Sequence, residues 1–120
     1  MTTLRIELPW PEPELSPNHR AHPLTKARAA RQAKADGYLA AKQALEGRAY
    51  VAPTFKLPLR LTFCPPSDRK RDADNLVASE KSYLDGIAQA LDVNDTRFEL
   101  TPVRGEILKP RGAVFVEIGP

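Results

Sequence analysis

The chain has a single cysteine, Cys64, among its 120 residues. One cysteine cannot form an internal disulfide, so a disulfide framework is excluded as the source of stability. The sequence also has little continuous apolar character: there is no long apolar run, and no charged-then-apolar start typical of a signal peptide. We therefore expect a soluble, cytoplasmic protein that does not enter a membrane.

Stability must then come from one apolar core. A chain of this length is of the commonest single-domain size and can bury roughly two-thirds of its unfolded surface. Eleven of the 12 prolines fall in three stretches, 9–23, 53–66 and 102–110, where most of them separate the expected helices and strands. We expect residues 1–120 to form a single domain.

The charge is modest in total but uneven along the chain. Lys and Arg number 18 against 15 Asp and Glu, a net charge of +3, which permits nucleic-acid binding without arguing for it. The charged residues of segment 19–48 are mostly basic, whereas those of segment 85–100 are mostly acidic. A positive surface next to an acidic cluster is suited to a protein that binds a polyanion and holds a metal ion near it, because the metal ion can neutralise both the carboxylates and the polyanion.

The hydrophobic pattern predicts both strands and helices. Alternating apolar residues predict four strands, and segments rich in Ala, Lys, Arg and Leu predict two helices, the first weakened at Gly37. The strands are expected at 4–8, 57–63, 98–103 and 114–118, and the helices at 24–45 and 75–91. We expect the last two strands to pair across a turn at 109–112. This order favours an α+β domain, with two helices packed on one face of a four- or five-stranded sheet.

The stretch from Asp68 to Asp95 is the most informative for chemistry. At about 100° per residue, Lys81 and Asp85 fall within about 20° of Asp74 on the predicted second helix, opposite its apolar stripe. Asp72 and Asp74 precede or begin that helix. In an extended segment, residues two apart point to the same side, so two carboxylates would face one site.

Paired carboxylates are suited to magnesium. This ion prefers hard oxygen ligands and usually binds through one or two carboxylates and substrate phosphate, which makes a phosphodiester the natural substrate. Lys81 is placed to neutralise charge that develops at phosphorus. The run Arg69-Lys70-Arg71 would hold flanking phosphates.

Each of these residues also has a structural interpretation. Asp74 could be a helix N-cap, Asp72 a charge in a solvated loop, and Asp95 a turn residue. Lys81 and Asp85 could form an ordinary i, i+4 pair on a helix surface. Spacing alone does not separate these alternatives from a metal site.

A set of motifs in a fixed order adds a further argument. The chain contains Leu8-Pro9-Trp10-Pro11, then Asn18 and Arg20, then Arg71-Asp72-Ala73-Asp74-Asn75-Leu76, then Leu84-Asp85-Gly86 and Asn94-Asp95. Over most of its length this pattern resembles the RusA family of Holliday-junction resolvases, small homodimeric nucleases of bacteria and their phages. Its central part is similar to the family's R-D-x-D-N-L.

The resemblance implies a function and a set of site residues. Asp72, Asp74 and Asp95 would be catalytic and would bind Mg²⁺ or Mn²⁺. A homodimer would nick a four-way DNA junction symmetrically in recombination or repair, with a phage or prophage origin. In the best-studied branch, the active-site lysine lies four residues after the second aspartate; here Ala78 occupies that position, and the role is assigned to Lys81. The expected DNA contacts are Arg69, Lys70, Arg71, Asn18, Arg20 and Asn75.

A second function class remains open. A basic α+β module could hold branched or duplex nucleic acid without cutting it, through the basic segment at 24–45. Three acidic positions count against this alternative, because carboxylates near DNA phosphates weaken binding unless a metal neutralises them.

Overall fold

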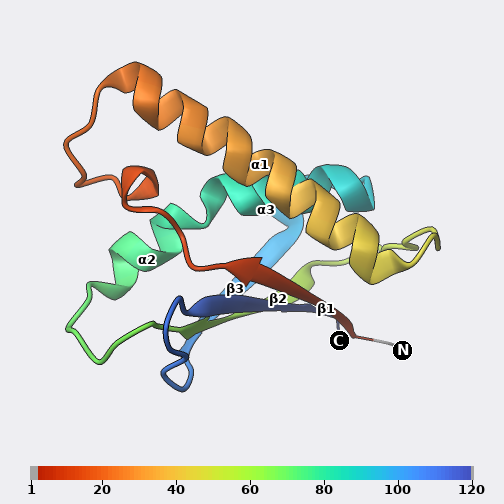
Figure 1. Ribbon diagram of the computed structural model, residues 1–120. Helices are drawn as coiled ribbons and strands as arrows, with labels where there is room; N and C mark the ends of the chain where they lie inside the picture. The colour runs from red at the N-terminus through yellow and green to blue at the C-terminus, as the bar shows by residue number, and fades with distance from the viewer. Residues whose placement is uncertain (1–2, 120) are drawn as a thin grey trace.

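The protein is described here by a computed structural model covering residues 3–119, in which four strands form one mixed sheet with the order β1-β4-β2-β3 (Figure 1). The strands are β1 (Leu4–Pro9), β2 (Leu57–Cys64), β3 (Phe98–Arg104) and β4 (Ala113–Ile118). The helices are α1 (Pro23–Leu45), α2 (Ala73–Ser79) and α3 (Lys81–Leu91), with short 3₁₀ turns η1 (Pro13–Leu15) and η2 (Asp95–Arg97). The predicted strand positions and the first helix are confirmed.

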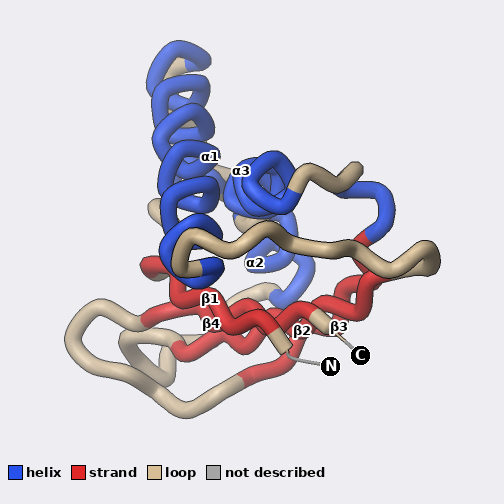
Figure 2. The backbone as a smooth tube through the Cα atoms, turned by 90° about the vertical axis from the view of Figure 1, so that its right-hand side faces the viewer, coloured by secondary structure: helices blue, strands red, loops and turns tan. Residues whose placement is uncertain are grey.

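The helices gather on one face of the sheet, as Figure 2 shows with the sheet seen along its edge. Apolar side chains on this face of the strands meet those of α1 and α3 in a single core, which includes the fully buried Leu59, Leu61, Ile87 and Val116. The alternation along β2 places Arg60 on the opposite, exposed face. The predicted α+β class, with helices on one face of a four-stranded sheet, is confirmed.

The predicted pairing of the last two strands is wrong. β4 lies between β1 and β2 and is antiparallel to both, whereas β3 is parallel to β2 at the edge of the sheet. The connection from β3 to β4 passes the end of β2, where Gly105 N donates to Phe63 O at 2.8 Å. Burial explains the order: β4 has four buried apolar residues and needs a central place, while six of the seven residues of β3 are exposed.

The predicted second helix is two helices. The helix is interrupted at Glu80, which lies between the end of α2 and the start of α3. The backbone N of Glu80 donates a hydrogen bond to Val77 O in a tight turn. Glu80 is fully buried, and both of its carboxylate oxygens lack a hydrogen-bond partner among residues 3–119. The angular positions of Lys81 and Asp85 relative to Asp74, which assumed one continuous helix, therefore do not apply across this interruption.

Gly37 does not interrupt α1, and it allows α3 to cross this helix closely. A Cβ at Gly37 would lie 2.3 Å from Tyr83 O, and one at Gly86 would lie 2.0 Å from Lys34 O. Both distances are far below van der Waals contact, so the crossing requires glycine on each helix. Although α1 has 23 residues, no helix within 3–119 is both long and apolar enough to cross a membrane.

Candidate active site

Asp95 lies in an open groove of about 280 Å³ between the α2–α3 segment and β3. It is the first residue of η2, a turn capped by Asn94, whose Oδ1 accepts hydrogen bonds from the backbone N and the hydroxyl of Thr96. These bonds fix the backbone that carries Asp95. The groove is lined by Val77, Ala78, Lys81, Leu84, Asp85, Asp95, Phe98 and Leu100.

Asp85 is the neighbour of Asp95 in this groove. Its pKa is raised, first by burial and then by a side-chain hydrogen bond with Asp95, while the positive charges of Lys81 and Lys34 act in the opposite direction. Two carboxyl groups this close disfavour ionisation of both. A divalent cation relieves that repulsion, and so the donor set suits a hard metal ion.

Lys81 is the first residue of α3 and faces the same groove, with its side chain exposed. Ala78, four residues after Asp74, lines the groove as well. Ala78 and Lys81 therefore line the same groove, although they belong to different helices. A lysine at either position reaches the groove that contains Asp95.

Asp72 is the N-cap of α2. Its Oδ1 accepts hydrogen bonds from Asp74 N at 2.9 Å and Asn75 N at 3.2 Å. Asp74 is an exposed residue of the first turn, where a negative charge also stabilises the helix dipole. The extended D-x-D geometry is wrong because the helix begins at Ala73, and the capping residue is Asp72 rather than Asp74.

The structure does not bring the three predicted metal ligands into one cluster. Asp72 lines a different groove from Asp95, and Asp74 lines neither. Among residues 3–119, no three Asp, Glu, His or Cys side chains are close enough together to hold a metal ion. The carboxyl group that the structure places beside Asp95 is that of Asp85, which was not one of the predicted ligands.

Most of the predicted DNA contacts surround the second groove, of about 440 Å³, between the start of α2 and the loop after β1. Five of the six line it; Arg20 is exposed but lies outside it. Those five are Asn18, Arg69, Lys70, Arg71 and Asn75. We call this the basic groove.

Arg71 stabilises the conformation of the loop before α2. Its guanidinium donates to Ser67 O and Arg69 O, both at 2.9 Å, and to Ser67 Oγ at 3.0 Å, and it lies over the Trp10 ring at 5.3 Å. Burial, then the positive charges of Arg69 and Arg104, lower the pKa of Arg71. Arg69 and Lys70 are exposed on the same loop, with charges that can reach phosphate.

Sequence reasoning did not assign a role to three residues that the structure places at these sites. Asp85 was placed on a helix face with Lys81, and this was the available signal for its role in the groove. Lys34 comes from α1, and nothing in the sequence linked it to Asp85. Trp10 was part of a motif, but its contact with Arg71 depends on the fold.

The fold and the grooves define a class: a small α+β domain with an acidic groove between the α2–α3 segment and β3, and a basic groove beside the start of α2. No family model matches the chain. The chain is 34% identical over 113 residues to an uncharacterized protein of Xylella fastidiosa strain Temecula1, covering 94% of this chain and 74% of that protein. The chain belongs to the same family as this Xylella protein.

Proposed function

We propose that the protein is a magnesium-dependent endodeoxyribonuclease of the RusA type that resolves four-way DNA junctions. The observation that carries this proposal is the groove in which Asp95, Asp85 and Lys81 meet. Two neighbouring carboxylates with a lysine at their side match the needs of phosphodiester hydrolysis, namely a metal site and a cation for the developing charge. The motif resemblance adds Asp72 and Asp74.

Each group has a distinct task in this proposal. Asp95 and Asp85 would hold the metal ion in their groove, whereas Asp72 and Asp74, the ligands that the family resemblance implies, lie outside that groove. A bound Mg²⁺ or Mn²⁺ ion supplies electrostatic stabilisation of the phosphoryl oxygens. Lys81 places a point charge beside the phosphate, and the basic groove binds the flanking strand through Arg69 and Lys70.

Paired cutting requires two sites. A homodimer with two-fold symmetry presents one groove to each of two opposed junction strands, which is the arrangement a symmetric product needs. The proposal therefore includes a homodimer acting on branched DNA of recombination, repair or phage replication in the cytoplasm. Mass measurement at micromolar concentration tests it, and a purely monomeric protein contradicts simultaneous cutting.

The cutting activity is tested with a synthetic four-way junction labelled on each strand in turn. With Mg²⁺ or Mn²⁺ we expect nicks at symmetric positions on two opposed strands, and none in the presence of chelator. A linear duplex of the same sequence is the matched substrate control. Absence of product with both metals, for a protein that still binds the junction, contradicts the proposal.

One observation favours a second candidate, a module that binds branched nucleic acid without cutting it. Asp72 already serves α2 as its N-cap, and residues 3–119 contain no cluster of three potential metal-ligating side chains. Such a module would bind the junction in a salt-sensitive manner, with an affinity that does not respond to metal. Product formation decides between the two candidates.

A further inference from the structure

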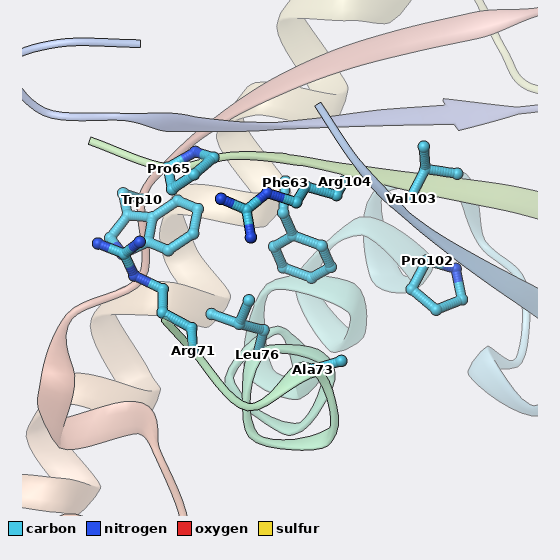
Figure 3. Close-up of a pocket in the computed structure, with 9 residues that line it drawn as sticks. All are labelled: Trp10, Phe63, Pro65, Arg71, Ala73, Leu76, Pro102, Val103 and Arg104. Atoms are coloured by element: carbon cyan, nitrogen blue, oxygen red, sulfur yellow. The ribbon is translucent and has the colours of Figure 1, made fainter. Parts of the chain in front are cut away.

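A separate pocket of about 170 Å³ lies beside the basic groove, where β2 and β3 end (Figure 3). Phe63, Leu76, Pro102 and Val103 contribute apolar surface to it. The Trp10 ring stands nearly perpendicular to Phe63, with ring centroids 6.2 Å apart. The pocket therefore combines aliphatic and aromatic surface, unlike the two grooves described above.

Two arginines line this pocket. Arg71 lies over Trp10 and Arg104 extends from the end of β3 toward Phe63, as Figure 3 shows. The residues lining the pocket include no acidic side chain. Two like charges next to an apolar cavity favour a ligand with one anionic part and one flat apolar part.

We infer that this pocket binds an unstacked nucleobase of a DNA strand, with Arg71 and Arg104 on the adjacent phosphate. The size agrees, because apolar cavities of about 150 Å³ accept a benzene ring. Aromatic surface and arginine are the groups that proteins use to hold bases taken out of the stack. The choice of DNA as ligand rests on the proposed function, and a junction offers bases with weakened stacking at its crossover.

Trp10 is the single tryptophan of the chain and lines both this pocket and the basic groove, so its fluorescence reports on binding at either place. We would titrate the protein, in chelator so that no cutting occurs, with three probes. These are an eight-nucleotide thymidine strand, an abasic deoxyribose-phosphate strand of equal length, and thymidine monophosphate. The abasic strand keeps the phosphates and removes the bases.

The thymidine strand should quench Trp10 and bind roughly 5- to 150-fold more tightly than the abasic strand, the range expected for one stacked base. Replacing Arg104 with alanine should weaken binding of the thymidine strand by at least about fivefold. The matched control, Arg60→Ala, removes the same charge from the exposed opposite face of the sheet and should change binding much less.

Equal affinity and equal quenching for the thymidine and abasic strands would overturn the inference. So would quenching by thymidine monophosphate at the same concentrations as the strand, because the site would then be one for free nucleotides. Failure of the nuclease proposal looks different. In that case the junction stays uncut with metal, while base-dependent quenching of Trp10 persists in chelator.

Discussion

The carboxyl groups of Asp85, within α3, and Asp95, the first residue of η2, lie next to each other although they are ten residues apart in sequence. Asp85 is partly buried, and its contact with Asp95 raises its pKa further. Such a pair is electrostatically unfavourable unless it binds a proton or a cation. Because Asp85 and Lys81 are both on α3, the contact with Asp95 places two carboxyl groups and a lysine in one groove, and the proposed chemistry depends on this arrangement.

Replacing Asp95 with asparagine should lower junction cleavage by about 100-fold or more, because a charged ligand of the proposed metal ion is lost. Asp92→Asn is the matched control. Asp92 is exposed and has a positive φ of 57°, which asparagine also tolerates. Rates of nicking at saturating Mg²⁺ provide the comparison, and equal loss in both variants would refute a special role for Asp95.

Lys81→Ala should reduce cleavage by roughly 100- to 1,000-fold while leaving junction binding nearly unchanged. Because Ala78 lines the same groove, the double variant Lys81→Ala with Ala78→Lys should recover part of the activity. Lys42→Ala on α1 serves as a control for charge alone. A double variant as inactive as Lys81→Ala, with normal folding, would argue against a lysine that acts through the groove.

Glu80 should make stability depend on pH. Burial raises its pKa from 4.5 to about 8, so its contribution to stability is fully present below pH 4.5 and is lost as the pH rises to about 8. The slope is at most about 1.4 kcal/mol per pH unit. In urea titrations across this window, the difference between wild type and Glu80→Gln should change with pH. A constant difference would show that Glu80 does not titrate there.

Gly86→Ala should destabilise the fold by about 1–3 kcal/mol, because the new Cβ would lie 2.0 Å from Lys34 O and force α1 and α3 apart. In an exposed helix the same change would stabilise by up to about 1 kcal/mol, so the sign is diagnostic. Gln89→Ala, exposed on the same helix, controls for general effects on α3. Urea midpoints measure both, and a midpoint raised in Gly86→Ala would contradict the close crossing.

The sequence predicted elements better than their arrangement. Alternation along 57–63 and 114–118 reports local burial, and these strands were predicted within one residue at each end. Strand order depends on contacts distant in sequence, and nothing local distinguished β3 as the edge strand. The break at Glu80 was also missed, because a glutamate in a helix-forming stretch gives no signal that it will be buried.

The site was predicted in parts. Residue types and motif order pointed to Asp72, Asp74, Asp95 and Lys81, and the structure places Asp95 and Lys81 together. The geometry around Asp72 could not be predicted, since capping and metal binding favour the same residue at a helix start. Lys34 could not be predicted either, because only the crossing of α1 over α3 brings it near Asp85.

The most direct test of the central claim uses Asp72, because its N-cap role and its proposed metal role can be separated. Asparagine caps helices as well as aspartate does, whereas alanine costs about 1 kcal/mol at this position. Asp72→Asn should therefore unfold at nearly the wild-type urea concentration, and it should bind the four-way junction. We predict that it cuts the junction at least about 100-fold more slowly than wild type in Mg²⁺; cutting at the wild-type rate would show that Asp72 is a capping residue alone and would contradict the account.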